Sequence, residues 1–398
     1  VKTVYISPKN VKNDAQAHDV AKNLSEILDV DYDRIYQKTQ KNNYYEVIKR
    51  KVENDVADKV RAYVKESKVS CVHLIDDTKR YYPYNNLASH IIGFVGTDNT
   101  GLDGVELTYN KYLQGTNGKL ITAKNNAGTE LPVEYETYVP AQDGATVALT
   151  IDTTVQYYLE KYIEQAREDN VCLSGAAGMI MDVKTGEILG MASKPDYDLN
   201  NYQQITDSLL QKELEAYVPD EENTLTKEEK ESQLLNVMRR NKLIVDTYEP
   251  GSTFKIITSA INLEENLKGN PNAYSVNYVF PSSRTRSVDG TTVKCWSNHA
   301  NGKHCNQTLA EALNNSCNPC FTDIALSIGK EKFYSYLTAF GFGRRTKIDY
   351  GGEAYGILMP QQAVRNCDLA RIGFGQTIAV SGIQLACATA SAMVKPTD

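Results

Sequence analysis

The residues with the clearest chemical potential are a serine and a lysine three positions apart. Ser252 and Lys255 lie in the run YEPGSTFK, where Pro250 and Gly251 interrupt the preceding structure before an apolar helical pattern begins. A serine at the start of a helix faces free backbone N–H groups, and a lysine three residues later shares its helix face. Burial can lower the pKa of a lysine until it accepts the proton of a serine hydroxyl. This spacing predicts a nucleophile and its general base, while a capping serine followed by a surface lysine is the structural alternative.

A second polar element, Ser316-Cys317-Asn318, follows further along the chain. The surrounding run ALNNSCNP predicts a tight turn between two helices, from which the hydroxyl and the amide can both project. A hydroxyl can relay a proton, and an amide can hold a substrate peptide bond. Each motif is weak alone, so the prediction of a catalytic site depends on their occurring together.

A dense group of metal-ligand residue types precedes the second motif. Residues 289–305 have the sequence DGTTVKCWSNHANGKHC, which holds two of the eight cysteines and two of the five histidines. The spacing C-x3-H-x4-H-C, with its soft thiolate and imidazole groups, predicts a Zn²⁺ site. A Cys295–Cys305 disulfide and a pair of reduced surface cysteines are the alternatives.

The composition is that of a globular protein with two or three domains. The chain has 398 residues, of which 41% are hydrophobic and 23% charged. The net charge of −7 gives no sign of the basic face that nucleic-acid binders carry. The most apolar stretch, residues 382–394, is too short to cross a bilayer and predicts a buried helix. The scattered cysteines argue against a disulfide scaffold.

Residues 1–145 predict a mixed α+β domain without a catalytic role. Residues 1–6 have the sequence VKTVYI, which predicts a strand, and residues 15–28 have helical spacing. Apolar residues three and four apart over residues 44–67 predict a second helix. Short strands and glycine-rich turns are expected after it.

A change of character near residue 140 marks a second domain, residues 146–398. Residues 145–151 (ATVALTI) predict a strand, and Asp152 is a plausible N-cap for a helix over residues 153–169. Further predicted elements are strands at 176–182 and 187–192 joined by a turn at 184–186, an exposed helix or loop at 224–232, and helices near 308–314, 317–328 and 382–394.

The combination of S-x-x-K with an S-x-N element is typical of penicillin-binding proteins and related β-lactamases, whose third motif is K-T-G. The chain resembles class B penicillin-binding proteins over nearly its whole length. The resemblance is carried, in the family's order, by RYYPY (80–84), ASH (88–90), GFVG (93–96), GLDGVE (101–106), LTID (149–152) with Gln156, DVKTGEILGMASKP (182–195), the two motifs, FGFG (340–343) and residues 373–384.

The resemblance implies an α+β multidomain fold. Residues 1–145 would form an N-terminal α+β pedestal, and residues 146–398 a transpeptidase domain of the β-lactamase-like kind, a sheet flanked by helices. Lys184-Thr185-Gly186 spells the third motif but precedes the serine, so we interpret it as a hairpin turn. Because no K-T-G or K-S-G follows Asn318, we expect the C-terminal part of that domain, with one oxyanion-hole N–H, to be missing from this sequence.

The resemblance also implies a peptidoglycan D,D-transpeptidase acting on stem peptides that end in D-Ala-D-Ala and inhibited by β-lactams. Ser252 would attack the penultimate D-Ala carbonyl, with Lys255 as general base. Ser316 would relay a proton to the leaving amine, and Asn318 would orient the donor amide. The chemistry needs no cofactor.

The overall likeness is to the septal and sporulation-specific branch of Gram-positive spore formers. Such proteins act on the extracytoplasmic face of the cell membrane through an N-terminal anchor, which this sequence lacks. A membrane glycosyltransferase is the expected protein partner.

The resemblance refines the predicted zinc ligands. Members without a metal often carry a Cys-Trp pair and a Gly-His-Gly run here, which Cys295 and His304 would match. His299 and Cys305 depart from that pattern, so we expect them to be ligands together with Cys295. Asp289 is the expected fourth ligand, with His304 as the alternative, and the site is expected to be structural.

Two other classes of function fit parts of the sequence. One is a serine hydrolase, either a D,D-carboxypeptidase or a β-lactamase-like enzyme, although a long N-terminal region is unusual for these. The other is a non-catalytic scaffold that binds division or sporulation partners through residues 1–150. The joint presence of Ser252, Lys255, Ser316 and Asn318 argues against a scaffold role alone.

Overall fold

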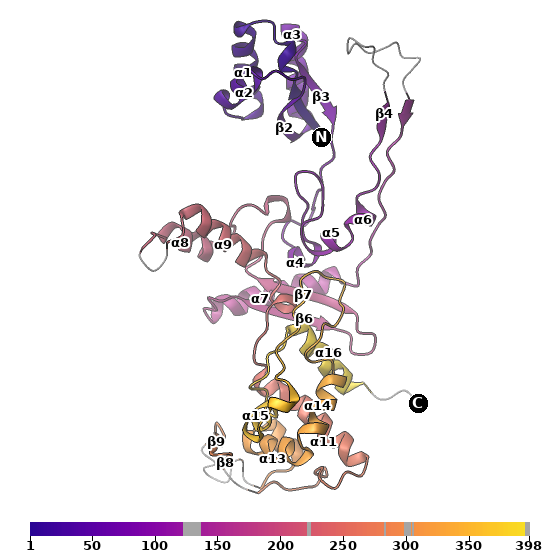
Figure 1. Cartoon of the computed structure of the whole chain (residues 1–398), viewed down its shortest axis with the longest axis vertical. Coiled ribbons are helices and arrows are strands. Elements are labelled where there is room, and N and C mark those ends of the chain that lie inside the picture. Colours follow the sequence, from indigo (N-terminus) through magenta and orange to yellow (C-terminus); the bar gives the residue numbers. More distant parts are fainter. Residues whose placement is uncertain (122–136, 221–223, 282–283, 298–303, 305, 395–398) are drawn as a thin grey trace. The chain divides into compact units, whose positions relative to one another are not determined.

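A computed structural model describes residues 1–121, 137–220, 224–281, 284–297, 304 and 306–394 (Figure 1). The chain forms two compact units. The first comprises Val1–Pro83 with Val95–Leu102, and the second comprises Tyr84–Phe94 with Asp103–Asp398. These units separate within residues 83–103, so they do not test the predicted domain boundary at residue 145, which stays a prediction.

The first unit is a three-stranded antiparallel sheet packed with helices. The strand order is β2-β1-β3. The strands are β1 Lys2–Ile6, β2 Glu46–Val52 and β3 Val72–Asp76, and the helices are η1 Pro8–Asn10, α1 Asp14–Leu28, α2 Tyr32–Thr39 and α3 Asn54–Ser67. Buried side chains such as Val4, Leu24 and Val60 form its core. The predicted strand at residues 1–6 and the helix at 15–28 are confirmed.

The helix predicted over residues 44–67 is wrong in its first part. Residues 46–52 form β2, which pairs antiparallel with β1 through Val47 opposite Tyr5 and Val52 opposite Lys2. This short run is rich in β-branched residues, and pairing with a neighbouring strand outweighs an apolar spacing that a helix could also use. The helix itself, α3, begins only at Asn54.

The second unit begins with short elements and a hairpin. They are α4 Ser89–Ile92, α5 Gly104–Thr108, α6 Asn110–Leu113, β4 Lys119–Ile121 and β5 Thr137–Val139. The strand predicted over residues 145–151 is wrong, because the structure assigns no strand there. Instead, Asp152 N–H donates to the Leu189 carbonyl and the Thr150 hydroxyl to the Ile188 carbonyl. These isolated bonds hold the segment without a regular ladder.

The predicted cap, helix and hairpin that follow are confirmed. Asp152 accepts hydrogen bonds from two backbone N–H groups at the start of α7 Thr153–Asp169. β6 Ala176–Met181 and β7 Ile188–Lys194 pair antiparallel. In the turn between them, the Asp182 carboxylate accepts from the N–H groups of Lys184 and Thr185. The interpretation of residues 184–186 as a hairpin turn is therefore confirmed.

The rest of the second unit is mainly helical. The elements are η3 Leu199–Asn201, α8 Ser208–Ala216, α9 Lys227–Arg239, α10 Lys242–Val245, η4 Gly251–Phe254, α11 Lys255–Leu267, β8 Thr285–Val288, β9 Thr291–Lys294, α12 Leu309–Asn314, α13 Asn318–Ile328, α14 Lys330–Ala339, η6 Gln361–Ala363, α15 Asn366–Ile372 and α16 Gly382–Met393. The predicted helices near 308–314, 317–328 and 382–394 are confirmed. Among the described residues, none of the helices combines the length and apolar character needed to span a bilayer.

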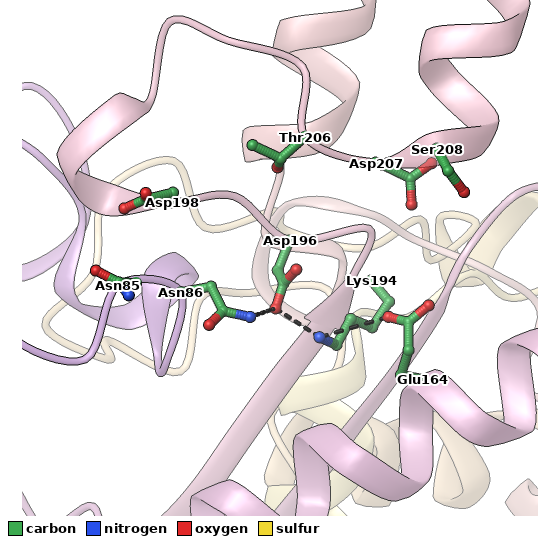
Figure 2. A pocket seen from close by; sticks show the side chains of 9 residues that line it. All are labelled: Asn85, Asn86, Glu164, Lys194, Asp196, Asp198, Thr206, Asp207 and Ser208. Atoms are coloured by element: carbon green, nitrogen blue, oxygen red, sulfur yellow. Dashed lines mark hydrogen bonds and ion pairs between the residues drawn. The ribbon is translucent and has the colours of Figure 1, made fainter.

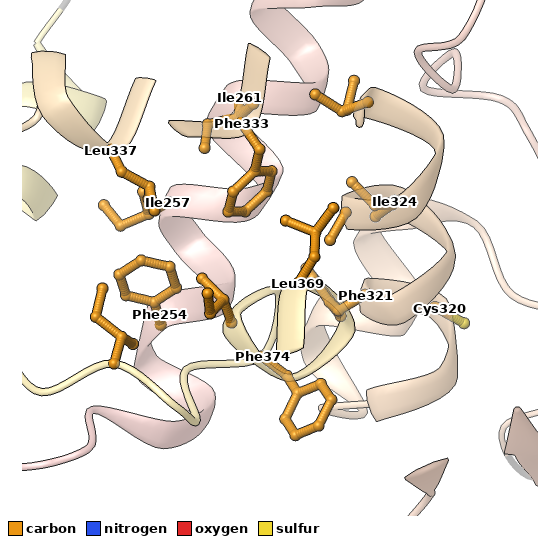
Figure 3. Packing of buried hydrophobic residues seen from close by; sticks show 14 of the residues in the cluster. Phe254, Ile257, Ile261, Cys320, Phe321, Ile324, Phe333, Leu337, Leu369 and Phe374 are labelled. Carbon is orange, nitrogen blue, oxygen red and sulfur yellow. The ribbon is translucent and has the colours of Figure 1, made fainter. Parts of the chain in front are cut away.

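An apolar core joins the helices that carry the two sequence motifs (Figure 3). Phe254 and Ile257, from η4 and α11, lie in one buried cluster with Phe321 and Ile324 of α13. Leu369 of α15 belongs to the same cluster. Each such side chain contributes roughly 1.5–3 kcal/mol on burial. The packing therefore fixes α11 against α13, and with it the start of each helix.

Candidate active site

Ser252 lies in a single 3-10 turn, Gly251–Phe254, that leads directly into α11. The preceding segment is tied to residues 375–380. Tyr248 and Val380 exchange two backbone hydrogen bonds, and the Gly251 N–H donates to the Gly375 carbonyl over 2.9 Å. Ser252 is exposed, whereas the neighbouring Phe254 is buried. The serine is thus presented to solvent from a rigidly held turn.

Four predicted residues meet at this turn. The Lys255 Nζ lies 3.1 Å from the Ser252 Oγ, and the Ser316 Oγ lies 2.8 Å from the same oxygen. The Lys255 Nζ also lies 2.9 Å from the Ser316 Oγ and 2.7 Å from the Asn318 Oδ1. The structure therefore brings Ser252, Lys255, Ser316 and Asn318 into one hydrogen-bonded group.

The S-x-N element occupies the turn that the sequence predicts. α12 ends at Asn314 and α13 begins at Asn318. Ser316 lies between them with φ of 51°, in the left-handed region that non-glycine residues seldom adopt. Such local strain is typical of functional sites. The Asn318 amide donates to the Lys294 carbonyl over 3.1 Å, which ties the turn to the end of β9.

Lys255 has the environment that a general base requires. Its side chain is fully buried, and this loss of solvent lowers its pKa to about 8, against the smaller opposing influence of the nearby Cys317, Cys295 and Cys320 thiols. A buried amine with a pKa near neutrality spends an appreciable fraction of time unprotonated. Lys255 therefore does not match the alternative of a surface lysine.

The hydrogen bonds around Lys255 direct its lone pair. The Ser316 carbonyl lies 2.9 Å from Nζ, and the Asn318 Oδ1 lies 2.7 Å away; both groups can only accept. A neutral amine has two N–H donors and one lone pair. Once its two donors serve those acceptors, the lone pair is left for a hydroxyl, and the Ser252 Oγ is within reach.

The backbone at Gly375 lies close to the segment that carries Ser252, and this contact gives the first prediction. Gly375 has φ of 82°, and an added Cβ would lie 2.0 Å from the Gly251 carbonyl oxygen. Gly375→Ala must therefore displace the segment that carries Ser252, and we expect covalent labelling by a penicillin to slow roughly 100-fold, the cost of a displacement near 1 Å. The measurement is the second-order rate constant of labelling.

Gly269→Ala is the matched control for this substitution. Gly269 has a similar φ of 74° but no atom within 4 Å of an added Cβ. Gly269→Ala carries only the cost of placing a Cβ in the left-handed region, about 1–2 kcal/mol. Equal labelling rates for the two variants would contradict the positioning role of Gly375.

A cluster of potential metal ligands lies beside the second motif. Cys295, His304 and Cys317 are all buried, and their ligand atoms lie within 4.8 Å of one another. The Cys295 Sγ is 3.4 Å from the His304 Nδ1. Cys317 is the central residue of the S-x-N element, so the cluster adjoins the hydrogen-bonded group of Ser252, Lys255, Ser316 and Asn318 through the chain itself.

The predicted ligand set requires correction at Asp289. This residue lies at the tip of the β8–β9 hairpin, whereas Cys295 follows the far end of β9. Four residues of strand separate the two by roughly 13 Å, too far for one zinc ion. The Asp289 carboxylate instead accepts from the Cys367 N–H over 3.3 Å.

The other predicted ligands have different outcomes. His304, the alternative ligand, lies in the cluster, whereas His299 and Cys305 lie outside the described residues. Cys295 is a free thiol in the structure, and the alternative of a Cys295–Cys305 disulfide involves a residue outside the described part of the chain. Sequence reasoning missed Cys317, although the C-x2-C spacing of Cys317 and Cys320 was a signal that could have indicated it.

A polar pocket of about 440 Å³ lies elsewhere in the second unit (Figure 2). Its lining residues are Asn85, Asn86, Glu164, Lys194, Asp196, Asp198, Thr206, Asp207 and Ser208. The Lys194 Nζ pairs with Asp196 over 2.5 Å and with Glu164 over 3.4 Å. Because the buried Lys194 ammonium group is already paired with two carboxylates, its charge is not available to bind an anionic ligand.

Comparisons with known proteins agree with this geometry. The penicillin-binding protein dimerisation domain matches residues 1–149, and the penicillin-binding protein transpeptidase domain matches residues 176–395. The chain is 34% identical over 98% of its length to stage V sporulation protein D of Bacillus subtilis, covering 54% of that protein. It is 28% identical over 97% of its length to peptidoglycan D,D-transpeptidase FtsI of Escherichia coli K12, covering 58% of it.

Solved structures show the same fold. The penicillin-binding protein PBP2 in complex with MreC from Helicobacter pylori matches 97% of this chain and 71% of its own, with a TM-score of 0.71 and 22% identity. The predicted α+β multidomain fold is therefore confirmed. The chain spans little more than half the length of the curated relatives described above. From the two matched domains and the converging S-x-x-K and S-x-N residues, the chain belongs to the class B penicillin-binding proteins.

Proposed function

We propose that this protein is a serine-type D,D-transpeptidase that cross-links peptidoglycan stem peptides. The observation that carries the proposal is the convergence of the Ser252 hydroxyl, the Lys255 amine and the Ser316 hydroxyl within 3.1 Å of one another. An exposed hydroxyl beside a buried amine is the arrangement that generates an activated nucleophile. The transpeptidase names of the relatives support the same reaction class.

The acylation half-reaction uses each of the four residues. Lys255 takes the Ser252 proton while the Oγ forms a bond to the carbonyl carbon of the penultimate D-Ala. The tetrahedral intermediate then expels the last D-Ala, whose nitrogen receives a proton through Ser316. The Asn318 side chain orients the donor amide. The products are an ester on Ser252 and free D-Ala.

The second half-reaction reverses the proton path. An amine from a neighbouring stem peptide attacks the ester carbonyl, a C–N bond forms, and the bond to the Ser252 Oγ breaks. Lys255 returns the proton to the serine. A β-lactam acylates the same hydroxyl by opening its ring, so its leaving group stays attached and the acyl-enzyme persists.

Product analysis tests the proposed reaction against simple hydrolysis. The protein is incubated with a peptide ending in D-Ala-D-Ala, with and without an acceptor amine, and the products are separated by mass. A transpeptidase forms the amide product when the acceptor is present. Release of the shortened acid alone, at a rate that the amine does not change, would indicate a D,D-carboxypeptidase instead.

The biological setting is also part of the proposal. We propose that the protein works in septal or spore-cortex wall synthesis, anchored at the extracytoplasmic face of the membrane and paired with a membrane glycosyltransferase. The similarity to a stage V sporulation protein supports this setting. Loss of cortex cross-links in spores lacking the protein would support it, whereas normal spores and septa would contradict it.

A zinc ion is the third part of the proposal. Two thiols and an imidazole, all buried and with ligand atoms within 4.8 Å, fit the preference of zinc for sulfur and nitrogen. Cys295, His304 and Cys317 would hold the ion, which would link the end of β9 to the S-x-N turn. Bound there, it would supply a structural cross-link and no step of the acyl transfer.

Metal content tests the zinc site. Cys317→Ala is expected to lose the bound zinc and to lower the unfolding midpoint by roughly 5 °C, because a bound ion stabilises only the folded state. Elemental analysis and thermal unfolding measure the two effects. Cys71→Ala is the control, since Cys71 is equally buried but lies in the first unit. Full zinc content in the Cys317 variant would overturn the assignment.

A further inference from the structure

Gln307 is a buried glutamine that lies just before α12, the short helix that leads into the S-x-N turn. Only 4% of its surface is accessible. A side-chain amide carries both donors and an acceptor, and burial makes either kind of group costly to leave without a partner. The proposed acyl transfer assigns no step to Gln307, so its partners indicate what it contributes.

The Gln307 side chain links its own backbone position to the far end of α12. Its Oε1 accepts a hydrogen bond from the Asn315 side-chain amide over 2.9 Å, and Asn315 directly follows the last residue of this helix. Its Nε2 donates to the His304 carbonyl over 3.0 Å. A helix of six residues has little stability of its own, so the bond to Asn315 fixes the position of the residue at the helix end.

The backbone of Gln307 is itself held in place. Gln307 and Phe280 exchange two backbone hydrogen bonds, which are 2.7 and 3.2 Å long. Phe280 is buried in the apolar core that also contains Phe254, two residues after Ser252. The amide of Gln307 is therefore attached to the same core as the turn that presents Ser252.

Asn315 in turn positions Ser316, the residue that follows it. Ser316 has φ of 51°, and such a strained conformation persists only where the surrounding contacts hold it. The Ser316 Oγ lies 2.8 Å from the Ser252 Oγ and 2.9 Å from the Lys255 Nζ. A displacement at Asn315 would therefore change both of the distances on which proton transfer depends.

We infer that Gln307 is a positioning residue that acts through Asn315 to hold Ser316 within hydrogen-bonding distance of Ser252. The inference rests on the proposed acylation of Ser252. Gln307 itself transfers no proton, so its loss should slow the acylation step and leave the noncovalent binding of a β-lactam nearly unchanged. Because a hydrogen bond has two ends, removing Gln307 or Asn315 should have the same effect, and removing both should add little to it.

Stopped-flow acylation by a fluorescent penicillin at increasing concentrations measures the first-order acylation rate constant and the dissociation constant separately. Gln307→Met keeps the length of the side chain but removes its donors and its acceptor. We expect the rate constant to fall about 10-fold, less than the roughly 100-fold cost of a displacement of about 1 Å. The dissociation constant should change less than about 2-fold. Asn315→Ala should give the same loss, and the double variant should also be about 10-fold slower than the wild type, whereas independent effects would multiply to about 100-fold.

Gln156→Met is the matched control for the loss of a buried amide. Gln156 is also buried, and its side chain donates to the Met191 carbonyl and accepts from the Met191 N–H, both over 2.8 Å. This variant should lose stability in thermal unfolding but keep the wild-type acylation rate constant. Should Gln307→Met fail to fold, Asn315→Ala tests the same bond from a partly exposed position.

An acylation rate constant within about 2-fold of wild type in the Asn315→Ala variant would overturn the role of Gln307. Losses that multiply in the double variant would do the same, as would an equal loss in Gln156→Met. Absence of acylation in the wild type would count against the proposed function instead.

Discussion

The Ser252→Ala variant is expected to form no covalent adduct with a fluorescent penicillin, even at concentrations that label the wild type completely. The substitution removes the only hydroxyl that contacts both the Lys255 Nζ and the Ser316 Oγ among the described residues. Because Ser252 is exposed, its loss creates no cavity and should leave folding unchanged. The measurement is in-gel fluorescence after denaturation, together with a thermal unfolding curve.

Ser259→Ala is the matched control for this experiment. Ser259 lies on α11, and its buried hydroxyl has no hydrogen-bond partner in the described part of the chain. Its replacement should therefore leave labelling intact. Persistent labelling of the Ser252 variant would assign the nucleophile to another residue.

Lys255→Met is expected to slow acylation by about 100- to 10,000-fold, the usual contribution of a positioned general base. Methionine fills much of the buried space but offers no lone pair of comparable basicity. The variant also leaves the Ser316 carbonyl and the Asn318 Oδ1 without their shared donor, which should cost about 1–3 kcal/mol of stability. Stopped-flow acylation rates and denaturant unfolding measure the two effects separately.

Lys255→Arg separates the role of the base from that of the charge. Arginine keeps a positive charge but does not lose its proton in proteins. We expect it to be as slow as the methionine variant. Recovery of the wild-type rate would show that a cation, and not a base, is needed at this position.

The pH dependence of the wild type gives the same hypothesis an independent check. The unprotonated amine is the active form, and burial lowers the pKa of Lys255 to about 8. The acylation rate constant should therefore rise about tenfold per pH unit below that value and level off above it. Lys255→Met should lack this rise. A flat wild-type profile between about pH 6 and pH 9 would contradict Lys255 as the base.

The proximity of Ser252 and Lys255 could be predicted because their spacing along the chain reflects local structure. Ser252 and Lys255 are neighbours on one helix face, and the helix start follows from Pro250 and Gly251. The distance between Ser252 and Ser316 was not predictable from spacing alone. It depends on packing between α11 and α13, which involves apolar residues such as Phe254 and Phe321.

The mistaken predictions share a physical cause. Residues 46–52 and 145–151 have patterns that several local conformations satisfy, and tertiary pairing decides between them. Residues 46–52 gain a strand partner in β1. Residues 145–151 make isolated bonds instead, such as those from the Ala145 N–H to the Tyr112 carbonyl and from the Thr150 hydroxyl to the Ile188 carbonyl. Neither partner could be identified from the local sequence.

The candidate metal ligands show the same limit of spacing arguments. The predicted ligands all came from residues 289–305. In the structure, however, β9 separates Asp289 at the hairpin tip from Cys295. Cys317 lies outside that window and reaches Cys295 through the fold of the S-x-N turn. A candidate ligand set drawn from two separate segments can be identified only from the three-dimensional structure.

The most direct test of the central claim is the mass and location of the adduct that wild-type protein forms with benzylpenicillin. Acylation of Ser252 predicts an intact mass increased by one whole penicillin molecule. After proteolysis, the added mass should lie on the peptide that contains Ser252. An unchanged mass, or an adduct on a peptide from any other part of the chain, would contradict the account.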